Sequence, residues 1–197
     1  ARRLGGHHPG SVALMDFVDL IITVHDHLDR TRIAHAFGGA LALGYVAEPR
    51  GTVDIDVNVF VPTARLDEVV AALEPAGFRP PDEVAAGPPV AGIRFTHTYE
   101  PFPLDVFPSL DERYAEVEAR AVRHPFGRGE DMLPFLSAED LCVFKLSFNR
   151  ARDWVDLAAV AQARPDLDLD VVGDLLVALR GPTMHPRLAR FRALFHQ

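Results

Sequence analysis

The chain has one cysteine, one lysine and no long apolar run. The single Cys142 excludes a disulfide framework and a cysteine-rich zinc site, and it fits a reducing compartment. A membrane-spanning helix needs roughly 20 consecutive apolar residues. The most apolar stretch, 13–24, contains Asp16 and Asp19, which also interrupt the apolar core that a signal peptide would need. We therefore expect a cytoplasmic protein with no membrane partner.

Positive charge is also scarce, because 20 Lys and Arg residues stand against 28 Asp and Glu residues, giving a net charge of -8. This balance excludes a protein coated with positive charge for non-specific binding of nucleic acid. Four of the bases lie together near the C-terminus, after the last acid, Asp174: Arg180, Arg187, Arg190 and Arg192. This arginine cluster is either the solvent face of a docked helix or a contact for RNA phosphates.

The remaining composition, 48% hydrophobic and 24% charged, is that of an ordinary globular protein with one full core. Hydrophobic periodicity predicts an α/β (α+β) domain over residues 1–136 and a helical region over residues 137–197. We expect 78–89 to be a loop and 122–129 to be irregular. The expected strands are 33–37, 52–61, 93–99 and 104–107, and the expected helices are 11–29, 40–45, 66–76, 111–121, 137–150, 153–163, 170–179 and 186–195.

The segment His25-Asp26-His27, near the end of the first expected helix, contains the residue types of a metal site. Side chains two positions apart on a helix point in different directions, so they do not converge on one ion. We therefore interpret the segment as a solvated helix end.

The clearest pattern in the chain is the alternation over 52–61, which places Asp54 and Asp56 on one face of a strand. Two carboxylates this close repel each other unless a cation lies between them. A third acid, Asp105, lies in the expected strand 104–107. If the two strands are neighbours, three carboxylates converge on one face. The alternative is a solvent-facing acidic strip without a ligand.

Carboxylate oxygens suit Mg²⁺, and one or two such ions would organise phosphoryl or nucleotidyl transfer. Phosphates also need amide donors, which a glycine turn at a helix N-terminus supplies. Gly38 and Gly39 lie between an expected strand and an expected helix. A glycine pair alone also occurs in plain turns. The order of these features along the chain is more informative than any one of them: a strand, the glycine pair, a helix, the Asp-x-Asp strand and a later Asp.

This order resembles that of the nucleotidyltransferase superfamily, in the segments 37–44 (FGGALALG) and 50–56 (RGTVDID) and in Asp105. Two later segments, 141–146 (LCVFKL) and 149–157 (NRARDWVDL), are more specifically similar to the AbiEii and MenT nucleotidyltransferase toxins of toxin-antitoxin systems. The resemblance implies a nucleotidyltransferase-like mixed sheet flanked by helices and followed by a C-terminal helical bundle. It also implies an NTP substrate and a cognate antitoxin protein.

The resemblance also implies site residues, two of which have open alternatives. Lys145, the only lysine, lies in an apolar helix and would contact the triphosphate, unless it is a surface residue with an extended side chain. Asp153 shares a helix face with Asp156, and its role is either a structural ion pair or substrate positioning. The implied catalytic residues are Asp54, Asp56, Asp105, Lys145 and Asp153, the implied metal ligands are Asp54, Asp56 and Asp105, and the implied nucleotide-binding residues are Gly38, Gly39, Thr52 and Lys145.

One departure from the family concerns the glycine pair, because many members have Gly-Ser where this chain has Gly38-Gly39. A hydroxyl that contacts phosphate is therefore missing, and Thr52 is a candidate to replace it. Thr52 is also a position where phosphorylation would place a dianion against Asp54 and Asp56 and block binding of the metal or triphosphate.

We predict from these residues a metal-dependent nucleotidyltransferase toxin. It would transfer NMP from an NTP to an RNA acceptor, the 3′ end of tRNA, and so block translation and growth. The same site could instead modify a small molecule of the aminoglycoside kind, or transfer AMP to a protein side chain. A third reading is a non-catalytic interaction module, but the ordered glycines, carboxylates and lysine are more typical of catalysis.

Overall fold

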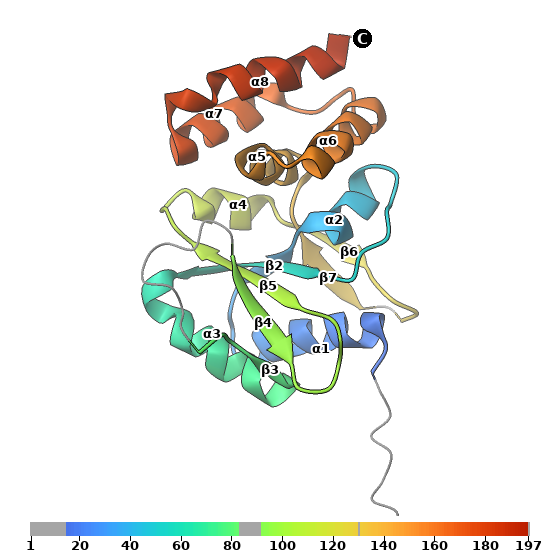
Figure 1. The fold of residues 1–197 in the computed structure, drawn as a ribbon, viewed down its shortest axis with the longest axis vertical. Coiled ribbons are helices and arrows are strands. Elements are labelled where there is room, and N and C mark those ends of the chain that lie inside the picture. The colour runs from blue at the N-terminus through green and yellow to red at the C-terminus, as the bar shows by residue number, and fades with distance from the viewer. Residues whose placement is uncertain (1–14, 83–91, 130, 197) are drawn as a thin grey trace, which may run out of the picture.

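The computed structural model describes residues 15–82, 92–129 and 131–196, which form a mixed α/β fold around a seven-stranded sheet (Figure 1). The strand order in the sheet is β3-β4-β5-β2-β1-β7-β6. The strands are β1 (His35–Phe37), β2 (Ile55–Pro62), β3 (Phe78–Arg79), β4 (Ile93–His97), β5 (Leu104–Ser109), β6 (Val122–Pro125) and β7 (Met132–Phe135). The helices are α1 (Phe17–Arg30), α2 (Gly39–Val46), α3 (Leu66–Leu73), α4 (Tyr114–Arg120), α5 (Ala138–Phe148), α6 (Ala151–Ala163), α7 (Leu169–Arg180) and α8 (His185–Arg192).

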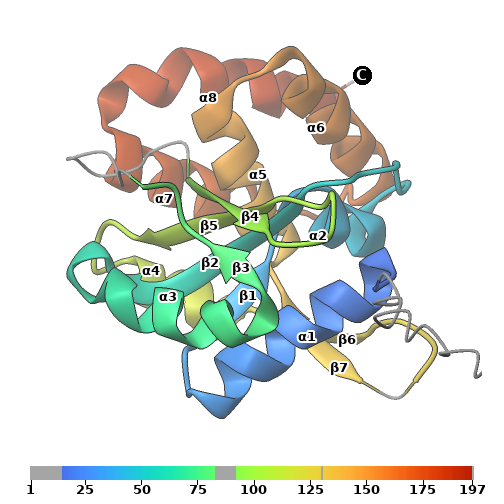
Figure 2. The ribbon, with the colours of Figure 1, turned by 60° about the horizontal axis from the view of Figure 1, so that its bottom comes forward.

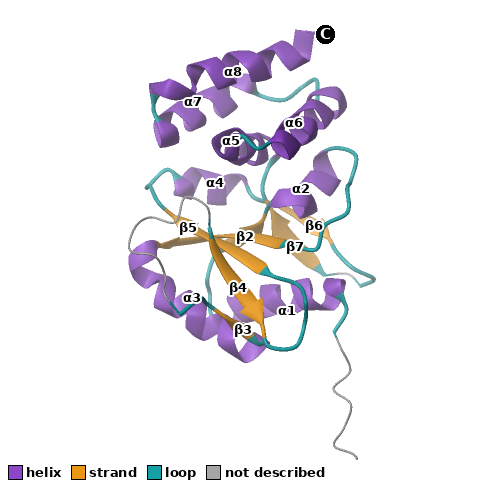
Figure 3. Cartoon of the chain, in the orientation of Figure 1, coloured by secondary structure: helices purple, strands orange, loops and turns teal. Residues whose placement is uncertain are grey.

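Helices cover both faces of the sheet. α1 and α3 lie on one face, and α2, α4 and α5 lie on the other (Figures 1 and 2). α5 contacts α2, α6 and α7, and the last helices lie beyond it, away from the strands (Figure 3). A mixed sheet flanked by helices and followed by a run of helices is the predicted fold class. The division of the chain into domains at residue 136 stays a prediction.

The centre of the sheet is the strand with the clearest alternation. Ile55, Val57 and Val59 of β2 are fully buried. β2 pairs antiparallel with β1 and parallel with β5, and Asp56 lies opposite Asp105 in the β2–β5 register. The expected adjacency of the Asp-x-Asp strand and the later aspartate strand is therefore confirmed. β4 adds to the other side of β5 in antiparallel orientation.

Two expectations from the sequence are wrong in the outer parts of the sheet. The segment 122–129 is not irregular throughout, because it begins with β6, which pairs with β7 as an antiparallel hairpin at the sheet edge. The first two residues of the expected loop 78–89 form β3, and residues 83–89 lie outside the described part of the chain. In addition, β2 begins at Ile55, so Asp54 lies in the turn before the strand.

The histidine segment at the end of α1 also differs from its interpretation. His25 is buried, not solvated, and its Nδ1 lies 2.8 Å from Nε2 of His35 on β1. Burial lowers the pKa of both rings, that of His35 to about 4, so both are neutral near pH 7. The two histidines therefore form a buried hydrogen-bonded pair between helix and sheet.

Within the three described ranges, no helix combines the length and the apolar composition that crossing a bilayer requires.

Candidate active site

A pocket between the sheet and the helices α5 and α6 contains most of the predicted site residues. Six of them line it: Gly39, Thr52, Asp54, Asp56, Lys145 and Asp153. Arg50, Arg150 and Arg152 add positive charge to the lining. The apolar part of the lining consists of Phe107, Leu136, Leu141, Phe144 and Phe148.

The glycine pair is fitted closely against the Asp-x-Asp segment. The backbone N–H of Gly38 donates to the carbonyl of Asp56 at 2.9 Å, and α2 begins at Gly39. Gly39 has a φ of +55°, and a Cβ at this position would overlap the Asp56 carboxylate. A glycine is therefore required here in this conformation. A serine, which many members of the resembled family have, would need a different arrangement of Asp56.

The Asp56 carboxyl group is electrostatically unfavourable in its ionised form. Burial, followed by the negative charges of Asp105 and Asp54, raises its pKa to about 6. The positive charges of Lys145 and Arg150 oppose this rise without cancelling it. A cation bound beside Asp56 would remove the strain of the three neighbouring acids.

Arg94 of β4, which is not among the residues predicted from the sequence, already occupies part of this acidic cluster. Its Nε and Nη2 donate to the two oxygens of Asp105 at 2.8 and 2.7 Å, and Nη2 also donates to Oδ1 of Asp54 at 3.2 Å. The hydrogen bond with Asp105 raises the pKa of Arg94 further above its ordinary value, so the guanidinium stays charged. The alternation of Ile93, Arg94 and Phe95 was the available signal, since both apolar neighbours are buried.

The carboxylates at the pocket suit Mg²⁺ as a partial set of ligands. Across the described residues, no group of three or more His, Cys, Asp or Glu side chains is arranged to hold a metal ion. Mg²⁺ does not require such a cage, because it binds through one or two carboxylates together with substrate phosphates and water. The half-buried Asp56, whose ionised form is disfavoured by desolvation and by the charges of Asp105 and Asp54, fits that partial set. Asp105 is held by Arg94 in this arrangement.

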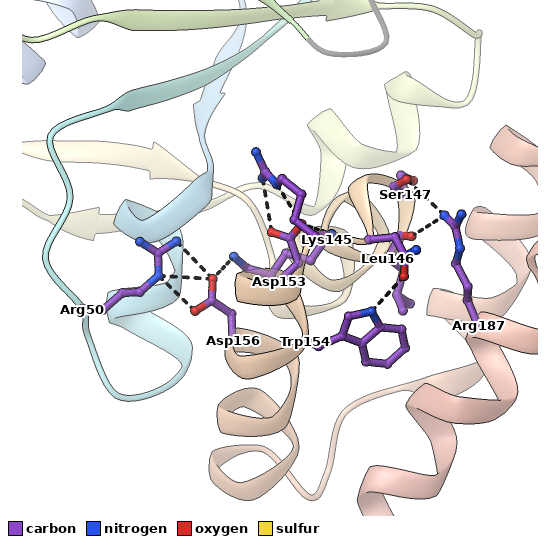
Figure 4. Close-up of polar contacts among 10 residues, drawn as sticks. Arg50, Lys145, Leu146, Ser147, Asp153, Trp154, Asp156 and Arg187 are labelled. Carbon is purple, nitrogen blue, oxygen red and sulfur yellow. Dashed lines mark hydrogen bonds and ion pairs between the residues drawn. The ribbon is translucent and has the colours of Figure 1, made fainter.

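Lys145 lines the pocket as a buried residue, 4% exposed, and is not the extended surface side chain that was the alternative. Its Nζ lies 2.6 Å from Oδ2 of Asp156 on α6, and Arg50 binds the same carboxylate through Nε at 3.0 Å and Nη2 at 3.1 Å (Figure 4). Burial of Asp156 would raise its pKa, but the hydrogen bonds from Arg50 and Lys145 outweigh burial and lower it. Asp156 therefore links the turn before β2 to both helices.

Asp153 has a structural contact of its own at the start of α6. It is 1% exposed, and its Oδ2 accepts hydrogen bonds from the backbone N and the Nε of Arg150, both at 2.9 Å. This is a capping box, which satisfies the free backbone groups of the first turn. α5 ends just before it at Phe148, and the following residue, Asn149, reverses the chain with a φ of +59°. Asp153 thus fixes Arg150 at the pocket.

Thr52 lies at the pocket in a local turn. Its Oγ1 accepts a hydrogen bond from the backbone N of Asp54 at 3.2 Å and donates to the carbonyl of Asp54 at 3.1 Å. The hydroxyl therefore shapes the turn that presents Asp54, and its predicted contact with phosphate stays a prediction.

The C-terminal arginine cluster is largely used in packing. Arg187 donates to the carbonyl oxygens of Leu146 and Ser147 at 3.1 and 3.2 Å (Figure 4). The guanidinium of Arg190 lies 3.7 Å from the ring centre of Trp154. These contacts favour the docked-helix interpretation of the cluster over an RNA contact.

Most of the chain matches one protein family. The family model described as "Nucleotidyl transferase AbiEii toxin, Type IV TA system" matches residues 26–192. No curated protein matches the chain.

Several solved structures share the fold, and they include the following three. The antibiotic-resistance factor ANT(2″)-Ia is 21% identical, with 91% of this chain and 95% of that chain covered and a TM-score of 0.57. An antigenic nucleotidyltransferase-like protein from Paracoccidioides brasiliensis is 18% identical, with 90% and 97% covered and a TM-score of 0.52. The lincosamide antibiotic adenylyltransferase LnuA is 13% identical, with 72% and 94% covered and a TM-score of 0.51. The predicted fold class is confirmed.

Proposed function

The chain belongs to the AbiEii family of nucleotidyl transferase toxins, and from this premise we propose that it transfers NMP from an NTP to the 3′ end of a tRNA in a Mg²⁺-dependent reaction. Such a transfer would block aminoacylation of the acceptor and stop translation and growth. The family is one of toxin-antitoxin systems, so a cognate antitoxin is the expected protein partner.

The observation that carries the proposal is the meeting of acids and bases in one pocket. Asp54 and Asp56 come from the sheet side of the pocket. On the other side, Lys145 lies on α5, Arg150 lies between α5 and α6, and Arg152 lies on α6. A metal-bound triphosphate needs both kinds of group, because its cation binds carboxylates and its phosphate oxygens bind guanidinium and ammonium groups. A solvated acidic strip would not need the bases.

Each group has a place in the proposed reaction. Asp54 and Asp56 would hold Mg²⁺, which when bound neutralises triphosphate charge and activates the attacking hydroxyl. Arg150 and Arg152 would bind phosphate oxygens, together with the Gly39 end of α2 and with Lys145. Asp105 would accept the proton of the RNA 3′ hydroxyl at a carboxylate oxygen. The hydroxyl oxygen then bonds to the α-phosphorus, the bond to the β-phosphate oxygen breaks, and pyrophosphate leaves.

The experiment is a labelling assay with purified protein, Mg²⁺, each of the four α-labelled NTPs in turn, and total tRNA. We expect labelled tRNA on a denaturing gel with the unchanged protein and at least a hundredfold less with Asp54→Ala. Asp67→Ala is the matched control, because Asp67 is an exposed acid on α3 away from the pocket lining, and its label should persist.

Parallel reactions contain an aminoglycoside, or the protein alone, in place of tRNA. Label on a small molecule or on protein, with none on tRNA, would reject the RNA acceptor and keep nucleotidyl transfer. The net charge of -8 is the feature that favours a basic small-molecule acceptor as the second candidate. No label on any acceptor with any NTP would reject the proposed function.

A further inference from the structure

Arg94, Asp105 and Asp56 form one row across three adjacent strands. Arg94 of β4 lies opposite Asp105 of β5, and Asp105 lies opposite Asp56 of β2. Residues directly opposite each other in a sheet project from the same face. The register therefore places one permanent cation beside two acids, and the turn before β2 adds the third acid, Asp54.

The guanidinium binds the acids as a fork. It engages both oxygens of Asp105, at 2.8 and 2.7 Å, and Nη2 also reaches Oδ1 of Asp54 at 3.2 Å. One atom of Arg94 thus bridges two of the three carboxylates, and Asp54 is also a proposed metal ligand. An oxygen that accepts from the guanidinium has less capacity to coordinate a metal, and two cations held by the same carboxylates repel each other.

The contact is also open to release. The side chain of Arg94 is 57% exposed, whereas those of Asp54 and Asp105 are 27% and 17% exposed. An exposed ion pair contributes little to stability, since water solvates the separated charges. The arginine is the most exposed of the three side chains and is therefore the member that can leave.

We propose that Arg94 is an internal counter-cation that competes with the divalent metal for Asp54 while it occupies Asp105, so that metal binding requires its guanidinium to move away. This rests on the proposed function only for the expectation that a divalent ion binds at these acids. While Arg94 is engaged, both oxygens of Asp105 are occupied and cannot accept the proton of an acceptor hydroxyl. Arg94 therefore holds the metal-free protein in an inactive arrangement.

The test measures metal binding without nucleotide or acceptor, with Mn²⁺ as the probe and free Mn²⁺ followed by electron paramagnetic resonance. We expect Arg94→Gln to bind Mn²⁺ about three- to tenfold more tightly than the unchanged protein, as the loss of a modest competing ion pair predicts. Arg94→Lys keeps the charge and loses the fork, so its affinity should lie between the two. Arg65→Gln is the control, because it makes the same charge change and frees an exposed acid, Glu68, elsewhere. Its affinity should equal that of the unchanged protein.

Affinity that is unchanged or weaker in Arg94→Gln would overturn the proposal, because Arg94 would then be neutral toward the metal or would support its ligands. Arg94→Lys keeps the inference testable if the glutamine variant does not fold, and thermal unfolding of each variant checks this. The outcome is independent of the labelling assay. Tighter Mn²⁺ binding without labelled tRNA would support this role of Arg94 and reject the proposed acceptor. Labelled tRNA without tighter Mn²⁺ binding would support the proposed acceptor and reject this role of Arg94.

Discussion

Replacing Asp156 tests whether the ion pair beneath the pocket stabilises the fold. Asp156→Ala removes the carboxylate that binds Lys145 at 2.6 Å and Arg50 at 3.0 Å. The side chains of Lys145 and Asp156 are only 5% and 3% exposed, so the ammonium group would be left buried without a counter-charge. Removing one partner of a buried pair costs about 3 to 5 kcal/mol. Arg50 is 36% exposed and would be solvated by water instead.

The assay is equilibrium unfolding by urea and by heat. For a chain of this length, the expected loss corresponds to a fall in the unfolding temperature of roughly 6 to 20 °C. Adding Lys145→Met to Asp156→Ala replaces the unpaired ammonium by an apolar group of similar length, so the double variant should regain at least half of the loss. Asp166→Ala is the control, because Asp166 pairs with Arg164 at the surface and is 69% exposed. Its expected cost is below about 1 kcal/mol.

Two results would refute this reasoning. A loss of less than about 1 kcal/mol in Asp156→Ala would show that the pair is solvated in solution, in spite of its low exposure. Additive losses in the double variant would show that Lys145 and Asp156 contribute independently and are not coupled.

Three further predictions concern the pocket and the histidine pair. Gly39→Ala should reduce nucleotidyl transfer in the labelling assay at least tenfold, because the added Cβ would displace the Asp56 carboxylate. Gly181→Ala is the control, because Gly181 also has a positive φ, +85°, but lies in open space. This variant should lose stability and keep its transfer activity. Asp56→Asn should stabilise the metal-free protein at pH 7.5 by about 1 to 3 kcal/mol in urea unfolding. The pKa of Asp56 is about 6 in the folded protein and lower in the unfolded chain, so the ionised acid opposes folding above pH 6. A destabilised variant would contradict this. For His35 the folded pKa of about 4 lies below the unfolded value, so its contribution to stability is present above about pH 6.5 and is lost as the pH falls toward 4. His35→Gln should therefore show a smaller loss of stability than the unchanged protein between pH 7 and 5, and equal losses would rule the histidine out as the cause.

The sequence predicts the central sheet well, because the strands there carry strong patterns. The alternation around Asp54 and Asp56 places the acids on one face, and the order of elements puts Asp105 nearby, as the register now confirms. β6 has no such pattern, because three of its four residues are exposed and the strand ends in Pro125. Proline is tolerated at a sheet edge, where its missing N–H faces no partner strand. Only pairing with β7 reveals this strand.

The site is less predictable than the fold because its charges meet through register and packing. Arg94 is visible in the sequence as a polar residue between Ile93 and Phe95, but the strand pairing alone decides that it meets Asp105. His25 has an acidic neighbour and looks solvated, yet its partner is His35, on a different element. Contacts of this kind depend on three-dimensional distance, which residue spacing does not supply.

The two halves of the pocket come from distant parts of the chain, and Arg50 and Asp156, which join them, are 106 positions apart. An inhibitor therefore has two routes to the same effect. It can fill the pocket, or it can bind the outer helices and draw α5 and α6 away from the turn before β2. The second route would leave each half intact and the carboxylates accessible, while separating the proposed metal ligands from the proposed phosphate-binding groups. An antitoxin acting in this way would be recognised by a loss of nucleotide affinity with metal affinity preserved.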